Sequence, residues 1–309
     1  MKREFTYPSK DGRTQIHGIE WIPEGDVRGV VQIAHGMVEF IGRYDRFARV
    51  LAEHGFYVTG NDHLGHGKSV TGESKLGYFA KQNGNLCVIA DMHHLREKTA
   101  RTYPDVPYFL FGHSMGSFLV RQYIEMHGEG LAGAVIMGTG YQPKQTLNAG
   151  ILLTNILAKT KGDHHRSNLV NNMALGSYNK SFEPARTPAD WLTRDEAIVD
   201  AYVAEPLCQF IFTVNGYNNL FRGMRYAQEP QNLAKIPKDL PVLVVSGAKD
   251  PVGNFGKGPE QVAQSYRETG IRDVTCKLYP EDRHELLNEL DKETVDGDIL
   301  SWFEAHMNR

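Results

Sequence analysis

The pentapeptide Gly112-His113-Ser114-Met115-Gly116 constrains the fold of this chain more than any other feature of its sequence. It follows a short apolar run, "YFLF", and opens "MGSFLVRQYIEMHG", whose apolar residues have helical spacing. A strand that turns directly into a helix brings backbone against backbone, so glycine is needed on both sides of the turn. Ser114 would then occupy a strained turn, with its Oγ above the sheet and beside the free N–H groups of the new helix. We therefore predict a strand–turn–helix unit with an exposed serine, the alternative being a serine that only caps the helix.

Short apolar runs alternate with longer segments of helical spacing over most of the 309 residues. Nearly continuous apolarity predicts strands that are buried on both faces, as in a parallel sheet covered by helices. The first residues instead predict two strands around a turn at Asp11-Gly12. We expect an α/β fold with a mostly parallel central sheet and helices on both of its faces. The later strand candidates begin at Val30, Phe56, Tyr108, Gly133, Val242 and Val274.

The alternation stops between about Tyr141 and Lys235, in a region rich in asparagine, lysine and aromatic residues. We interpret this region as a helical cap inserted over the C-terminal edge of the sheet, where open α/β folds bind ligands. Residues 1–140 and 236–309 would then form the two parts of the core, and residues 141–235 the cap (lid) insertion. Peripheral helices without a functional role are the alternative.

The stretch "DHLGHGKS" at residues 62–69 ends like a phosphate-binding loop but does not fit one. Such a loop requires glycine five residues before the glycine of Gly-Lys-Ser, because backbone amides wrap the phosphates there. Counted back from Gly67, that position is Asp62, whose carboxylate would repel phosphate. The formal charge of −3, with both signs mixed along the chain, provides no basic field for nucleic acid. Neither nucleotide nor nucleic-acid binding is expected.

The N-terminal residues and the cysteines bear on the cellular location of the protein. The segment "MKREFTYPSKDGR" contains no apolar run typical of a signal peptide. The most apolar segment, residues 149–159, is too short to cross a bilayer, so at most peripheral contact with a membrane or micelle is expected. The three distant cysteines, Cys87, Cys208 and Cys276, fit reduced thiols better than a disulfide framework. We expect a cytoplasmic protein, and homo-oligomerisation stays open.

Two later segments supply the groups that would activate a serine hydroxyl, which is a weak nucleophile until a base accepts its proton. In a fold of this kind, an acid and then a histidine are expected after late strands. Asp250 ends the run "VLVVSGAKD", and His284 stands between "CKLYP" and a C-terminal segment of helical spacing. Either residue alone could have a structural role. Their order after the serine predicts a triad of Ser114, His284 and Asp250.

The run "QIAHGM" predicts a place for the negative charge that such chemistry develops. It leaves a strand at His35-Gly36-Met37, and a turn there can aim backbone N–H groups at an oxyanion. We expect the donors to be the N–H groups of Met37 and of Met115, the residue after the serine. A His-Gly dipeptide is common, so this prediction depends on the other motifs.

Together these motifs resemble those of the α/β-hydrolases, and more narrowly those of the monoacylglycerol lipase and lysophospholipase branch, which is grouped with serine aminopeptidase-like hydrolases. The resemblance spans the sheet core and rests on "HGM", "DHLGHGKS", "GHSMG", "SGAKDPVGNFGKG" and "LYPEDRHELLNE". It implies that Ser114 is the nucleophile, His284 the base and Asp250 the orienting acid. It also implies that "DHLGHGKS" is a structural loop near the active site. One departure is Ser117, where relatives often have a second glycine.

The expected reaction is hydrolysis of a carboxylic ester through an acyl-enzyme, with no metal or cofactor. We expect a small-molecule ester substrate, in particular an acyl lipid, and Glu39 is expected to face the pocket and influence polar head groups. The apolar stripe "ILLTNIL" at residues 151–157 lines an acyl channel in one interpretation, with Leu153 and Leu157 as lining residues, and forms the core of the cap in the other. Adjacent histidines at 93–94 and 164–165 do not predict a metal site, because neighbours on a helix face different directions.

Three alternatives to an esterase stay open. A thioesterase would use the same nucleophile, and a non-catalytic ligand-binding protein would use the pocket without needing the acyl-transfer groups. An aminopeptidase would need carboxylates around the amine of its substrate. The cap carboxylates that could serve it are Glu183, Asp190, Asp195, Glu196 and Glu205.

Overall fold

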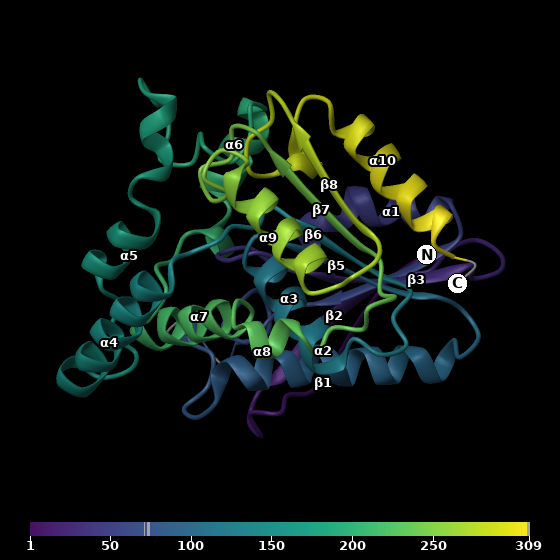
Figure 1. Cartoon of the computed structure of the whole chain (residues 1–309). Helices are drawn as coiled ribbons and strands as arrows, with labels where there is room; N and C mark the ends of the chain where they lie inside the picture. Colours follow the sequence, from purple (N-terminus) through teal and green to yellow (C-terminus); the bar gives the residue numbers. More distant parts are fainter. Residues whose placement is uncertain (71, 73–74, 308–309) are drawn as a thin grey trace.

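The computed structural model describes residues 1–70, 72 and 75–307 and contains one twisted sheet (Figure 1). Among these residues the sheet has eight strands in the order β1-β2-β4-β3-β5-β6-β7-β8. Strands β1 and β2 run antiparallel to their neighbours, and the others run parallel. This arrangement confirms the predicted fold class. The strands are β1 (Lys2–Pro8), β2 (Gln15–Trp21), β3 (Gly29–Ala34), β4 (Phe56–Asn61), β5 (Tyr108–His113), β6 (Gly133–Met137), β7 (Val242–Gly247) and β8 (Val274–Tyr279).

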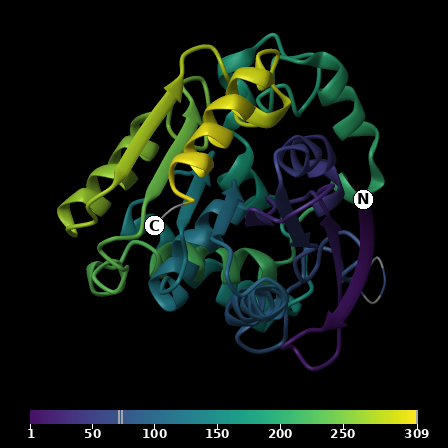
Figure 2. The same ribbon diagram turned by 90° about the vertical axis from the view of Figure 1, so that its right-hand side faces the viewer.

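Helices cover both faces of the sheet because alternate residues of the inner strands point to opposite sides. Figure 2 views the molecule so that β1 lies at one edge of the sheet and β7 and β8 near the other. One face packs on α1 (Asp45–Glu53) and α10 (Lys292–Ala305). Side chains of this face include Phe109, Phe111, Val135, Leu243 and Val245.

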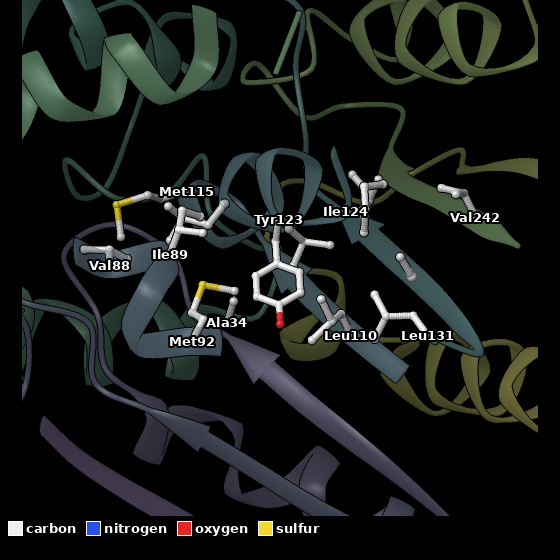
Figure 3. Close-up of a cluster of buried hydrophobic side chains, with 14 of the residues drawn as sticks. Ala34, Val88, Ile89, Met92, Leu110, Met115, Tyr123, Ile124, Leu131 and Val242 are labelled. Atoms are coloured by element: carbon white, nitrogen blue, oxygen red, sulfur yellow. The ribbon is translucent and has the colours of Figure 1, made fainter. Parts of the chain in front are cut away.

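The other face packs on α2 (Gly84–Thr102), α3 (Met115–His127) and α9 (Lys257–Glu268). Figure 3 shows part of this cluster, in which Tyr123 of α3 lies among Met92 of α2 and Leu110 of β5. The side chains at the start of α3 are therefore fixed by the core on which the helix packs. Further members of this cluster include Ala34, Val88, Ile89, Ile124, Leu131 and Val242.

The segment predicted as a cap, residues 141–235, is called the cap region below. It is largely helical and lies between β6 and β7. Figure 1 shows α4 and α5 at the side of the molecule, with α7 between them and the core. Phe118 of α3, Leu147 of α4 and Met224 of α7 form a small cluster that attaches this region to the core. Its elements are α4 (Lys144–Lys161), α5 (Asn168–Leu175), η3 (Tyr178–Phe182), α6 (Glu196–Ala204), η4 (Pro206–Cys208), α7 (Val214–Tyr226) and α8 (Pro230–Leu233).

The loop "DHLGHGKS" folds around the buried carboxylate of Asp62. Its oxygens accept hydrogen bonds from the backbone N–H groups of Ile41 and Lys68, each at 2.8 Å. A Cβ at Gly67, which has φ +49°, would overlap this carboxylate. Gly67 therefore serves the packing of Asp62, and Gly65 allows the backbone of Tyr78 to approach the loop. Within the described residues, no helix combines the length and apolarity that crossing a membrane requires.

Candidate active site

Ser114 occupies the predicted turn between β5 and α3. Its backbone has φ 53° and ψ −120°, a region that non-glycine residues rarely adopt. A Cβ at Gly116 would overlap the carbonyl oxygen of Ala34 in β3, and one at Gly112 would overlap the carbonyl oxygen of Gly116. Glycine is required at both positions because the turn packs backbone against backbone. These contacts stabilise the strained backbone of Ser114, and its N–H donates a hydrogen bond to the carbonyl oxygen of Met137 at 3.0 Å.

His284 and Asp250 form a buried hydrogen-bonded pair. The Nδ1 of His284 lies 2.9 Å from Oδ2 of Asp250, and the two residues are 2% and 0% exposed. Because the carboxylate accepts, Nδ1 carries the proton and Nε2 is left as the basic nitrogen. Asp250 is itself fixed by the N–H of Val252 at 2.8 Å and by the hydroxyl of Ser246 at 3.3 Å.

Ser114 and His284 line one cavity of about 490 Å³, which lies between the core and the cap region. This volume is typical of small-molecule sites. Met37 and Met115 line the same cavity. A Cβ at Gly36 would lie 3.1 Å from the Cβ of Ser114, so the turn that carries Met37 approaches the serine closely. Met115 begins α3, where N–H groups have no acceptor inside the helix.

Glu39 supports that turn from behind. One carboxylate oxygen accepts hydrogen bonds from the N–H of Gly36 and from the hydroxyl of Tyr44, the latter at 2.8 Å. The other accepts from Arg43 at 2.8 Å, and Arg43 also binds Glu285 with two hydrogen bonds of 2.6 and 2.8 Å. Glu39 lines the cavity, as expected, but its carboxylate is occupied by groups of the protein itself.

His113, next to Ser114, links the Glu39 carboxylate to the segment carrying His284. Its Nδ1 lies 3.3 Å from Oε1 of Glu39, and its Nε2 lies 3.2 Å from the carbonyl oxygen of His284. Both ring nitrogens thus face acceptors, which favours the protonated ring. Burial opposes the charge of His113, but its hydrogen bond to Glu39 and the charge of that residue raise the pKa above its usual value. Burial likewise opposes the charge of Glu39, and the bond to His113 with the charge of Arg43 lowers the pKa of the carboxyl.

Neutral histidines pack behind the same turn. The N–H of His63 donates to Nε2 of His35 at 2.9 Å, so the proton of His35 resides on Nδ1 and is donated to the carbonyl oxygen of Gly36 at 2.8 Å. Burial lowers the pKa of His35 and His63 and lowers that of His66 to about 3. These side chains therefore stabilise the turn without adding charge to it.

The cavity wall is mainly apolar and aromatic, and α4 contributes to it. Leu153 lines the cavity, as expected, together with Leu147 and Phe221. Leu157 is not among the lining residues of the described chain; it packs, partly buried, against the core one turn further along α4. Of the two leucines expected to line an acyl channel, the structure thus places Leu153 at the cavity and Leu157 beside it. Leu152 and Ile156 lie on the opposite side of α4 and are 61% and 50% exposed.

The five cap carboxylates considered for an aminopeptidase lie elsewhere. None of them is among the described residues that line the cavity. Asp190 accepts hydrogen bonds from Arg186 and Thr187, Asp195 caps α6, and Glu205 caps η4. The acids at the cavity are Glu39 and Glu285, which share Arg43.

Sequence reasoning missed Arg43, Tyr44, His113 and Glu285 as parts of the site. Arg43 and Tyr44 follow "HGMVEF" on a short 3-10 helix, η1 (Ile41–Tyr44), and only the fold brings Arg43 to Glu285 and Tyr44 to His113. His113 was visible as the variable residue of the pentapeptide, but its partners lie 74 and 171 positions away. No local signal could have paired these groups.

A mostly parallel sheet, a serine in a strained strand–helix turn and an Asp–His pair after late strands together define an α/β-hydrolase. The family model described as serine aminopeptidase, S33, matches residues 25–291. The chain belongs to this family.

Several proteins similar to this chain are lipases or esterases. A monoacylglycerol lipase of Mycolicibacterium smegmatis is 28% identical over 99% of this chain and 98% of its own length. The monoglyceride lipase of Mus musculus is 26% identical over 91% of this chain and 84% of its own length. Among solved structures, a thermostable carboxyl esterase from Bacillus coagulans in complex with glycerol superposes with a TM-score of 0.92. It is 28% identical, and the match covers 99% of this chain and 98% of that one.

Proposed function

We propose that this chain is a serine-dependent carboxylic ester hydrolase that acts through an acyl-enzyme, with Ser114 as nucleophile, His284 as base and Asp250 as its orienting acid. The observation that carries the proposal is the buried His284–Asp250 pair, which shares one cavity with a serine in a strained strand–helix turn. The ester hydrolases among its relatives support the same reaction.

In the proposed mechanism, Nε2 of His284 accepts the proton of Ser114 while Oγ attacks the ester carbonyl carbon. Asp250 keeps the imidazole in the tautomer that can accept and stabilises the imidazolium that forms. The negative oxygen is stabilised by the N–H groups of Met37 and Met115, each worth about 3 kcal/mol of barrier. His284 then protonates the leaving alcohol, and a water molecule repeats the sequence to release the acid.

Glu39 would act on this site by holding the Gly36-Met37 turn rather than by binding the substrate with a free carboxylate. The hydrogen bonds from Gly36, Tyr44 and Arg43 support this role. An effect of Glu39 on polar head groups would then be transmitted through the position of the oxyanion donors.

The proposed substrate is an ester with an apolar acyl chain, such as a monoacylglycerol. The apolar wall to which Leu153, Leu147 and Phe221 belong supports an acyl-binding role, and each methylene that is buried there contributes about 0.8 kcal/mol. The names of the relatives point to the same class.

Peripheral contact with a membrane or micelle is part of this proposal. It is supported by four large apolar side chains of α4 and α5 that are at least half exposed, Leu152, Ile156, Leu169 and Met173. Replacing Leu152 and Met173 by serine should reduce sedimentation with phosphatidylcholine vesicles; unchanged sedimentation would contradict it. We also propose a cytoplasmic location, with which the three free cysteines are compatible.

An aminopeptidase is the weaker alternative, because the cavity acids Glu39 and Glu285 are already paired with Arg43 and so do not offer a free carboxylate to a substrate amine. A thioesterase would need the same catalytic groups as an esterase, so only a comparison of substrates distinguishes the two activities. A non-catalytic binding protein would have no use for a strained serine beside a buried Asp–His pair.

A fluorophosphonate probe and a parallel substrate panel test the proposal. The probe should label the wild type but not Ser114→Ala, since only an activated serine reacts. Of monoacylglycerols, p-nitrophenyl esters, acyl thioesters and aminoacyl amides, the esters should be hydrolysed fastest. Equal labelling of both proteins, or a preference for amides, would contradict the proposed function.

A further inference from the structure

The loop that carries His284 is bound directly to a short part of the cap region. The side chain of Arg283 donates to the carbonyl oxygens of Asp190 and Thr193, the latter at 3.2 Å. The N–H of Glu285 donates to the carbonyl oxygen of Leu192 at 2.7 Å. Both neighbours of His284 are thus hydrogen-bonded to the 190–194 segment.

Arg194 strengthens this attachment with charge. Its guanidinium lies 2.5 Å from Asp282, 2.8 Å from Glu289 and 2.5 Å from Asp291. Asp282 and Glu289 are fully buried, so removing Arg194 would leave uncompensated buried charge. These acids come within metal-ligating distance of one another, but Arg194 already provides the positive charge among them. The segment and the loop are therefore expected to move as one unit.

This attachment places Trp191 on the ring of His284. The two ring centroids are 4.9 Å apart at an interplanar angle of 39°. The ring of His113 also packs on His284, at 4.8 Å. Trp191 is held in turn by the ring of Tyr178, at 5.0 Å between centroids, and by its backbone N–H, which donates to Oδ1 of Asn179 at 2.9 Å.

We propose that Trp191 is a positioning residue for His284: the 190–194 segment holds the indole against the imidazole, so that the cap region fixes the orientation in which the ring accepts a proton from Ser114. The inference rests on the proposed function in that His284 is taken as the base. It assigns a role in the reaction to a cap residue that contacts neither Ser114 nor the oxyanion turn in any interaction described above. The hydrogen bond to Asp250 fixes the position of Nδ1 of His284, but the imidazole could still rotate about that hydrogen bond. The packing of Trp191 on the ring would restrict this rotation.

The charged and titratable groups that face the pair come from several elements. Asp250 follows β7, His113 ends β5, and Tyr178 belongs to η3. Glu39 acts on His113, and Glu285 is the chain neighbour of His284. Burial raises the pKa of Tyr178 well above neutral pH, and Glu39 stays ionised there because its pKa is lowered. In the loop that carries His284, burial and the nearby Asp291 and Glu289 raise the pKa of Asp282 to about 7. The test must therefore separate the contact with His284 from the titration of Asp282.

Tryptophan fluorescence reports the contact directly, because a protonated imidazole against an indole quenches its emission. Trp302 lies 4.4 Å from His306 and must first be replaced by phenylalanine. The remaining Trp21 donates to Asp45, whose pKa is lowered to about 2, so its emission should not change between pH 5 and 8. In this background, emission should fall as the pH is lowered, with the same midpoint as the acid limb of kcat/KM.

Two variants show which residues produce the change in emission. His284→Gln should abolish the emission change while keeping His113, and Trp191→Phe should abolish it by removing the reporter. If the transition persists in His284→Gln, or if no transition is seen, the proposed contact is wrong. This readout needs no ester hydrolysis, so it stands or falls separately from the function proposed above.

The kinetic test compares Trp191 with a cavity residue that does not contact His284. Trp191→Ala should lower kcat on a short p-nitrophenyl ester about tenfold and move the acid limb of the pH profile, and Trp191→Phe should restore most of kcat. The matched control is Phe221→Ala, which enlarges the same cavity from α7 and should leave the midpoint of the pH profile in place.

The outcomes of the kinetic test are distinct. An unchanged kcat and pH profile in a folded Trp191→Ala would overturn the inference alone. The same shift of the midpoint in Phe221→Ala would also overturn it, because the effect would then come from cavity shape. Hydrolysis that survives Ser114→Ala would instead remove the proposed function.

Discussion

Strands β3 to β7 bury every side chain, whereas the cap region leaves several large apolar side chains in solvent. All residues of β3 to β7 are buried, but Leu152 and Met173 in the cap region are 61% and 64% exposed. The proposed nucleophile and oxyanion donors lie at the ends of these core strands, and the wall of the cavity comes largely from the cap region. The comparison suggests that the core fixes the reaction and the cap region selects the substrate. We expect the 190–194 segment to be an exception, because it belongs to the cap region but is bound to the loop of His284 and so affects the reaction itself.

The largest effect is expected from the core. Asp250→Asn should lower kcat about 10⁴-fold, because the amide no longer favours the tautomer of His284 that accepts a proton. The unfolding midpoint should change much less, since an amide oxygen can still accept from Val252. Steady-state kinetics and calorimetry on one preparation check both; a kcat within tenfold of the wild type would show that Asp250 does not orient the base.

The packing of the core can be tested at the turn itself. Gly116→Ala should cost about 3 kcal/mol or prevent folding, since the added methyl overlaps the carbonyl oxygen of Ala34. Gly297→Ala is the matched control, because it also lies inside a helix and its Cβ would meet open space. That variant should be stabilised by up to about 1 kcal/mol. Equal denaturation midpoints for the two variants would refute the close approach at Gly116.

A smaller effect is expected behind the oxyanion turn. Glu39→Gln should lower the free energy of unfolding at pH 7 by about 2 kcal/mol, as hydrogen bonds to a buried charge are lost. Because the pKa of Glu39 is lowered by folding, its contribution is present above the unfolded value of 4.5 and is lost as the pH falls through the folded value. The difference between variant and wild type should therefore shrink below about pH 4.5.

Urea denaturation at pH 7, 5 and 3.5 measures this dependence. Glu304→Gln is a suitable control, because Glu304 pairs with Arg28 at the surface and such pairs contribute little. A difference for Glu39→Gln that grows towards low pH would contradict the lowered pKa.

The smallest effect concerns the cavity wall. Leu153→Ser should weaken the preference for octanoyl over acetyl p-nitrophenyl esters by about fivefold, because part of the acyl chain loses apolar contact. Leu157→Ser, one turn further along α4 and outside the cavity lining, should leave the ratio unchanged. Equal shifts for both variants would mean that they act through the packing of α4.

The strand positions, the Ser114 turn and the places of Asp250 and His284 after late strands were open to prediction because each depends on a short stretch of the sequence. Buried strands are visible in the sequence as short apolar runs, and a turn that requires glycine is visible from the glycines themselves. The parallel sheet then brings the ends of β5 and β7 to the same edge. Sequence order and sheet geometry together were therefore enough.

The supporting groups could not be predicted in the same way. Arg43 meets Glu285, and Trp191 meets His284, only because the chain returns to the same edge of the sheet after a long excursion. In α4 the helical pattern revealed an apolar stripe but not the direction in which it points. Leu153 and Leu157 share a face by spacing, yet only Leu153 reaches the cavity.

The covalent intermediate provides the most direct test of the central claim. Rapid quenching of the enzyme with a slowly deacylating p-nitrophenyl ester, followed by mass spectrometry of the digested protein, locates the acyl group. We predict one acyl group, on the peptide containing Ser114, and none in His284→Gln. An acyl group on another residue, or ester turnover without any covalent intermediate, would contradict it.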